Sequence, residues 1–194
     1  ADLVSEDQLD FHRPITEEVH RHGGRILLQI LHTGRYSYQE GCVAPSPITA
    51  PINFYRPKEL DHEEILQTID DYALCAKLAQ MAGYDGVEVM GSEGYLINEF
   101  IVKKTNHRTD EWGGSYENRI RLPISIVEKV REATGSDFLI VYRLSCLDLV
   151  EEGSSFEEVV ELGQRIEEAG ASLINTGIGC DAARIPPLAM MVPR

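Results

Sequence analysis

Four short apolar runs, separated by segments of helical periodicity, constrain the fold of this chain more than any other feature. The runs have the length and β-branched content of strands buried in a parallel sheet, and they span residues 25–31, 86–90, 138–144 and 172–176. Apolar residues recur with a helical period at about 14–22, 63–81, 115–133 and 156–169. The order is therefore α-β-α-β-α-β-α-β. This order implies a parallel sheet with right-handed crossovers.

Two architectures satisfy that order, an open doubly wound sheet and a closed eight-stranded barrel. No G-x-G-x-x-G follows any of the runs, so the phosphate turn of the dinucleotide-binding open sheet is missing. Polar residues instead gather just after the runs: His32, Arg35, Glu93, Tyr95, Arg143, Ser145 and Asp181. A (β/α)8 barrel carries its chemistry at these strand ends. The pattern therefore favours a TIM barrel.

The number of strands limits how much of a barrel this chain can form. Four strands make half of the eight that a closed barrel needs. No linker or second domain is visible, so residues 1–194 are expected to form one domain. We predict an α/β fold, a partial (β/α)8 TIM barrel of roughly four βα units. We expect the chain to be an internal fragment of a longer protein.

Charge and composition narrow the classes of partner. The net charge of −14 opposes general binding to nucleic acid or anionic membranes. No apolar run approaches the roughly 20 residues that span a bilayer, and the first residues lack the features of a signal peptide. The four cysteines are scattered and form no C-x-x-C pair, so no metal or iron–sulfur signature is present. We expect a cytoplasmic protein with reduced thiols and a small-molecule substrate.

The most informative stretch follows the second run. It reads Met-Gly-Ser-Glu-Gly-Tyr-Leu-Ile-Asn-Glu-Phe over residues 90–100, and Asn-His-Arg-Thr-Asp-Glu-Trp-Gly-Gly-Ser-Tyr-Glu-Asn-Arg over residues 106–119. Ser115 is a good N-cap for the helix after it. The stretch resembles the old yellow enzyme family of NADH:flavin oxidoreductases, which carries G-Y-L-x-x-x-F and then R-x-D-x-W-G-G-S-x-x-N-R at this spacing. The resemblance extends to residues 29–35, 44–46, 142–145 and 175–179.

Within the family, three segments resemble the bacterial 2,4-dienoyl-CoA reductases: residues 32–39, 87–95 and 183–186. The resemblance implies FMN as the cofactor, NADPH as the reductant and an enoyl- or dienoyl-CoA thioester as the substrate. It places the activity in fatty acid β-oxidation. For the longer protein it also implies FAD and a 4Fe-4S cluster, neither bound by this segment.

Two polar residues in apolar runs are candidate flavin contacts. Gln29 offers both a donor and an acceptor, which match the edge of an isoalloxazine ring; the alternative is a core glutamine bonded to backbone. Arg143 cannot lose its charge and so needs an anionic partner. The resemblance places this arginine near flavin N1 and C2=O. The alternative is an ion pair with a buried carboxylate.

Three residues are candidate catalytic groups: Tyr95, Glu93 and Asp181. A phenol stays protonated at neutral pH, as a proton donor must, and the resemblance implies that Tyr95 protonates the substrate carbon. Enone-reducing relatives carry a pair of carbonyl-binding histidines, or His and Asn, where this chain has Met90 and Glu93. The resemblance assigns Glu93 to the catalytic hydrogen-bond network. Asp181 stands where dienoyl reductases place a histidine, and an aspartate is a poor acid.

Other polar residues are candidate substrate contacts. His32 and Arg35 follow the first run, and Arg184 lies in the last family segment; the alternative for His32 and Arg35 is a solvated loop. The basic loop of Lys103, Lys104 and Arg108 either holds the phosphates of a CoA ester or forms a solvated face.

Taken together, the sequence predicts an FMN-dependent oxidoreductase that reduces an activated C=C bond, with NADPH-linked dienoyl-CoA reduction preferred. The alternatives are another enzyme of the same family, such as an enone reductase or an amine dehydrogenase, or a chain that is inactive on its own. The last alternative follows because a barrel's usual phosphate-binding loops come after its last two strands.

Overall fold

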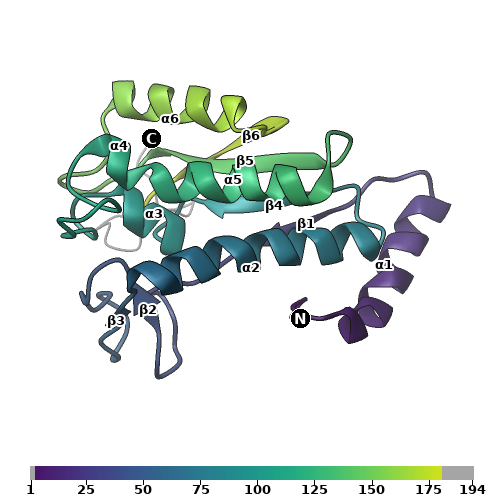
Figure 1. Ribbon diagram of the computed structural model, residues 1–194, viewed down its shortest axis with the longest axis horizontal. Helices are drawn as coiled ribbons and strands as arrows, with labels where there is room; N and C mark the ends of the chain where they lie inside the picture. The colour runs from purple at the N-terminus through teal and green to yellow at the C-terminus, as the bar shows by residue number, and fades with distance from the viewer. Residues whose placement is uncertain (1–2, 181–194) are drawn as a thin grey trace, which may run out of the picture.

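The computed structural model describes residues 3–180, which fold around a four-stranded parallel sheet (Figure 1). The sheet has the order β1-β4-β5-β6, with β1 at Leu27–Ile30, β4 at Gly86–Gly91, β5 at Leu139–Leu147 and β6 at Leu173–Ile178. Each strand pairs in parallel with its neighbour, and Leu27 lies opposite Gly86, which lies opposite Leu139. The predicted α/β fold with parallel strands is confirmed.

Helices connect the strands and cover one face of the sheet. Figure 1 shows α2 (His62–Met81), α5 (Arg121–Thr134) and α6 (Phe156–Glu168) along the same side of the strands. The remaining elements are η1 (Glu6–Gln8), α1 (Leu9–Arg21), β2 (Val43–Ala44), β3 (Lys58–Glu59), α3 (Leu96–Ile101) and α4 (Tyr116–Arg119). β2 and β3 pair with each other in a separate two-stranded sheet.

The core lies between the helices and the sheet because side chains alternate along each strand. Val87 and Val89 of β4 and Ile140 and Tyr142 of β5 are fully buried beneath the helices. The helical period predicted for residues 63–81 is confirmed, since its apolar positions are buried: Ile65, Ile69, Tyr72, Ala76, Leu78 and Ala79. The opposite face of the sheet, here called the inner face, carries Gln29, Glu88, Arg143 and Asn175 together with apolar side chains such as Val141.

Capping residues set where the longer helices begin. Asp61 accepts the Glu64 N–H at 2.9 Å, and the Glu64 side chain accepts the Asp61 N–H at 3.0 Å, which forms a capping box at the start of α2. Ser155 and Glu158 form the same box at α6. The predicted N-cap Ser115 is confirmed, because its hydroxyl accepts the Asn118 N–H.

Two helices differ from the prediction. The segment 115–133 is split at Ile120 into α4 and α5, which leaves Pro123 in the first turn of a new helix, where no backbone N–H is needed. α1 begins at Leu9, five residues before the predicted start at Pro14. Tertiary contacts account for the earlier start: His12 is hydrogen-bonded to Tyr84, and Thr16 donates to the Ala82 carbonyl at 2.7 Å.

No helix within residues 3–180 is both long and apolar enough to cross a membrane.

Candidate functional site

A row of polar side chains occupies the inner face of the sheet. Gln29 of β1 donates from Nε2 to Glu88 Oε2 at 2.6 Å, and Asn175 of β6 donates from Nδ2 to Glu88 Oε1 at 2.6 Å. The Glu88 carboxylate therefore binds one amide with each oxygen. Gln29 is exposed on this face, and its hydrogen-bond partner is a carboxylate, so it is not the backbone-bonded core glutamine considered as the alternative.

Arg143 of β5 forms an ion pair with Glu93, which follows β4. The Glu93 Oε1 atom accepts from Arg143 Nε at 3.0 Å and from Nη2 at 2.5 Å. Both side chains are partly exposed, at 27% and 25%. The predicted cofactor contact and the predicted catalytic carboxylate thus lie in direct contact. An ion pair with a carboxylate is the alternative stated above for Arg143, although Glu93 is only partly buried, and the flavin contact stays a prediction.

The turn that carries Glu93 has an unusual backbone. Glu93 has a φ of 64° and Gly94 a φ of 85°, so two consecutive residues lie in the left-handed region. A residue with a Cβ avoids this region, and exceptions concentrate at functional sites. Space on the inner face is also tight, because a Cβ on Gly177 would lie 2.6 Å from Ser92 Oγ and 3.0 Å from Glu93 Oε1.

Tyr95 lies at the N-cap of α3, one residue after this turn. Its ring is half-buried and contacts Tyr36 edge-on, with ring centroids 5.8 Å apart. The next backbone N–H, of Leu96, donates to the His32 carbonyl at 3.0 Å. The loop after β1 and the turn after β4 are therefore joined beside Tyr95.

His32 is half-buried in the loop after β1. Its Nδ1 accepts the Gly34 N–H at 3.0 Å, which leaves Nε2 as the donor of the neutral ring. Burial lowers the pKa of His32 below the usual 6.5, and the nearby Asp71 carboxylate only partly opposes this shift. His32 is therefore neutral at neutral pH.

The other predicted substrate contacts lie elsewhere. The Arg35 side chain points inward: it is 3% exposed, its Nη1 donates to the Ile48 carbonyl at 3.4 Å, and its backbone N–H donates to Glu99. Its substrate role stays a prediction. Asp181 and Arg184 lie outside the described residues.

The basic loop of residues 103–108 does not present three cations to solvent. Arg108 is buried and donates to Asp110, to the Leu60 carbonyl at 2.6 Å and to the Pro45 carbonyl at 3.1 Å. Its charge and its donors are used within the protein. Only Lys103 and the half-buried Lys104 of this group face outward.

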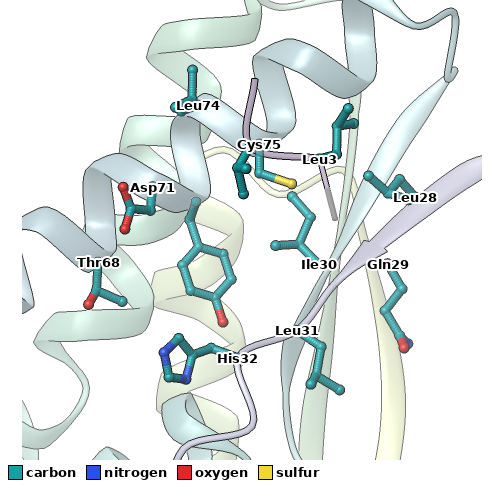
Figure 2. Close-up of a pocket in the computed structure, with 12 residues that line it drawn as sticks. Leu3, Leu28, Gln29, Ile30, Leu31, His32, Thr68, Asp71, Leu74 and Cys75 are labelled. Carbon is teal, nitrogen blue, oxygen red and sulfur yellow. The ribbon is translucent and has the colours of Figure 1, made fainter. Parts of the chain in front are cut away.

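One cavity lies between β1 and α2. It has a volume of about 490 Å³ and is lined by residues of β1 and α2, with Leu3 and Val4. In Figure 2, Gln29 leaves β1 in a different direction from His32 and points away from Asp71 and Cys75 of α2. Burial raises the pKa of Cys75 to about 11, so this thiol is protonated and unreactive. The cavity is a gap on the helix side of the sheet.

Sequence patterns had not singled out several residues of the site. Glu88 lies in the run GVEVM, where the sequence indicates only that a carboxylate occurs in an otherwise apolar strand. Asn98 and Asp148 are buried next to the Glu93 turn, and neither had a signal beyond its polarity. Within residues 3–180, no group of three or more His, Cys, Asp or Glu side chains is arranged to hold a metal ion.

Comparison with known proteins gives consistent matches over nearly the whole chain. Residues 1–192 match the NADH:flavin oxidoreductase / NADH oxidase family. An NADH oxidase of Thermoanaerobacter brockii is 38% identical over 170 residues, which are 85% of this chain and 26% of that protein.

Solved structures agree in fold. A 2-naphthoyl-CoA reductase in complex with 2-naphthoyl-CoA superposes with a TM-score of 0.87 and 32% identity, covering 93% of this chain and 30% of that one. An old yellow enzyme homologue from Zymomonas mobilis superposes with a TM-score of 0.83 and 33% identity, covering 92% of this chain and 54% of that one.

These neighbours are TIM barrels of which this chain covers a part, so the predicted partial barrel is confirmed over the open doubly wound sheet. The chain spans only 26% of the NADH oxidase that it matches. The family match covers almost every residue, and the motifs around Tyr95 and Arg143 lie within it. The chain therefore belongs to the NADH:flavin oxidoreductase / NADH oxidase family, which includes the old yellow enzymes.

Proposed function

We propose that this chain supplies the catalytic strand ends of an FMN-dependent enzyme that reduces a dienoyl-CoA thioester, with NADPH as the reductant. The observation that carries the proposal is the contact of Glu93 with Arg143 on the inner face, with Tyr95 two residues after Glu93 at the N-cap of α3. The chain covers only part of its relatives, so the activity is proposed for the whole protein.

The residues of the inner face fit a flavin. Gln29 is exposed there; one N–H of its amide binds Glu88, which leaves the second N–H and the carbonyl oxygen for the mixed donor and acceptor edge of the ring. Arg143 donates hydrogen bonds from Nε and Nη2 to Glu93, and among the described residues its Nη1 has no acceptor. When bound, FMN supplies the hydride from N5 of its reduced ring.

Each side chain has a separate role in this proposal. Arg143 would hold its positive charge near a bound flavin, on whose ring negative charge develops on reduction. Glu93 holds the guanidinium in that direction through two hydrogen bonds. Tyr95 holds the proton that is delivered to the substrate carbon next to the one that receives hydride.

The residues at positions 90 and 93 support this substrate class. Met90 is buried, and an ionised Glu93 can only accept hydrogen bonds, so neither donates to an enone carbonyl as a histidine pair would. This favours a conjugated thioester over a simple enone. A solved structural neighbour, 2-naphthoyl-CoA reductase, is in complex with 2-naphthoyl-CoA, a CoA thioester.

Asp181 and two further cofactors of the longer protein complete the proposed enzyme and lie outside the described residues. Asp181 would assist Tyr95 as a hydrogen-bond acceptor. FAD and a 4Fe-4S cluster would belong to the longer protein and relay electrons from NADPH. They are expectations from the resemblance to dienoyl-CoA reductases.

The test is Tyr95→Phe in the complete protein. Loss of the proton donor should lower the rate of dienoyl-CoA reduction by about 100-fold, the usual contribution of general acid catalysis. Reduction of the flavin by NADPH, followed by its absorbance in a stopped-flow experiment, should be unchanged because that step does not need the phenol.

Tyr36→Phe is the matched control, because Tyr36 packs against Tyr95 and the variant keeps its ring. It should retain dienoyl-CoA reduction. If Tyr95→Phe reduces the thioester at the wild-type rate, Tyr95 is not the proton donor.

A further inference from the structure

The turn that carries Glu93 and Tyr95 rests on a buried hydrogen-bond network that the proposed chemistry does not use. The Gly94 N–H donates to Asn98 Oδ1 at 2.8 Å. Asn98 Nδ2 donates to Asp148 Oδ1 at 3.1 Å. Asn98 and Asp148 are 1% and 2% exposed, so water does not compete for these bonds.

Asp148 connects the turn to the end of β5. Its Oδ1 also accepts from Ser145 Oγ at 2.7 Å, and its Oδ2 accepts the Ser154 N–H at 2.8 Å. Ser145 follows Arg143 by two residues on the same strand. The carboxylate therefore links β5 and the loop before α6 to the turn after β4.

The network has a fixed polarity. An ionised carboxylate can only accept hydrogen bonds. The Asn98 amide must therefore point its donor, Nδ2, toward Asp148. Its Oδ1 then faces the Gly94 N–H. If the amide flipped, two N–H groups would face each other at Gly94.

We propose that Asp148 and Asn98 are positioning residues that hold the Glu93–Tyr95 turn through the Gly94 amide. Glu93 and Gly94 both have positive φ, a conformation that Glu93 does not prefer and that surrounding contacts must maintain. With the turn held, Glu93 reaches Arg143 and Tyr95 begins α3. The catalytic consequence rests on the proposed function, while the structural one does not.

A reciprocal exchange of the two side chains tests this polarity. Asp148→Asn sets an amide N–H against Asn98 Nδ2 or, if the new amide flips, against the Ser154 N–H, because each carboxylate oxygen of Asp148 accepts from one of these donors. Asn98→Asp sets two carboxylates against each other. The double variant Asn98→Asp/Asp148→Asn restores a donor between residues 98 and 148. The new amide donates to residue 98 and to Ser145 Oγ, whose own proton loses its former acceptor, and it accepts the Ser154 N–H. The new carboxylate accepts the Gly94 N–H.

The first measurement is hydrogen exchange of the Gly94 amide in this chain without any cofactor. Each single variant should speed exchange about tenfold, as expected for one lost buried hydrogen bond, and the double variant should return close to the wild-type rate. Asn118→Asp is the matched control. It disturbs another loop, where Asn118 donates to the Asp110 and Gly113 carbonyls, and should leave Gly94 unchanged.

The second measurement is made in the complete protein. Each single variant should slow thioester reduction about tenfold at saturating substrate and leave flavin reduction by NADPH unchanged, and the double variant should recover the rate. If Gly94 exchange responds as expected but no form reduces the thioester, the positioning role stands and the proposed function fails.

Two results would overturn the positioning role. One is a Gly94 exchange rate that none of the variants changes. The other is a folded double variant whose Gly94 amide exchanges faster than in the wild type. This second result tests the role even if both single variants fail to fold.

Discussion

Among single residues, His32 shows how burial beside the site sets a protonation state. Its pKa is lowered in the folded chain, so as pH falls the unfolded chain takes up the proton first. The stability that neutral His32 contributes is therefore complete above its unfolded pKa of about 6.5. It is lost as pH falls from there through the folded pKa.

This pH dependence can be isolated with His32→Asn, which keeps a side-chain acceptor within reach of the Gly34 N–H but does not titrate. The free energy of unfolding, measured with denaturant at several pH values, should fall less steeply below pH 6.5 in the variant. An equal pH slope in both proteins would show that His32 titrates normally in the folded state.

The roles of individual residues were the least accessible to sequence analysis. Gln29 and Arg143 could be identified because a polar group in an apolar strand needs a partner, but the partners Glu88 and Glu93 come from another strand and its turn. Arg108 is polar in a loop, as a solvated residue would be, yet it is buried among backbone carbonyls. Periodicity carries no information about which loop groups turn inward.

At the scale of secondary-structure elements, two glycines differ in the space available for a side chain, one in the sheet and one in a helix. A Cβ on Gly91, in β4, would lie 2.2 Å from the Tyr142 ring of β5. A Cβ on Gly163, inside α6, would meet nothing closer than the Ile174 side chain at 3.6 Å. The same substitution should therefore have opposite effects at the two sites.

Gly91→Ala should lower the free energy of unfolding by about 1–3 kcal/mol, as overpacking of a core does. Gly163→Ala should raise it by about 0.5–1 kcal/mol because alanine loses less entropy in a helix. Chemical denaturation of both variants checks the pair. A destabilised Gly163→Ala would mean that α6 has less room beside Ile174 than its contacts indicate.

Long elements followed from the sequence, and short ones did not. The four strands and the helices α2 and α6 lie close to their expected bounds, because burial imposes a clear period over many residues. β2 and β3 have two residues each and α3 has six, which is too short for any period to be recognised. The start of α1 depended on contacts with Tyr84 and Ala82, which are distant in sequence.

At the scale of the whole molecule, the chain spans 26% of the NADH oxidase that it matches, and the usual phosphate-binding loops of a barrel follow its last two strands. We expect this chain alone to bind FMN more weakly than about 10 μM, a loss of several kcal/mol relative to a nanomolar site. Titration of FMN, followed by quenching of its fluorescence, measures this affinity, with the complete protein as the control. A stable yellow complex at low micromolar FMN would contradict this expectation.

The two hydrogen bonds of Glu88 also bear on the shape of the sheet. It lies on β4, and its two partners come from β1 on one side and from β6, beyond β5, on the other. Strands two places apart in a flat sheet are about 9–10 Å apart, too far for a short amide and a carboxylate to meet easily. The bond from Asn175 to Glu88 therefore favours strands that curl toward the inner face. One carboxylate thus joins strands on both sides of β4 across the inner face, as the curvature of a barrel allows.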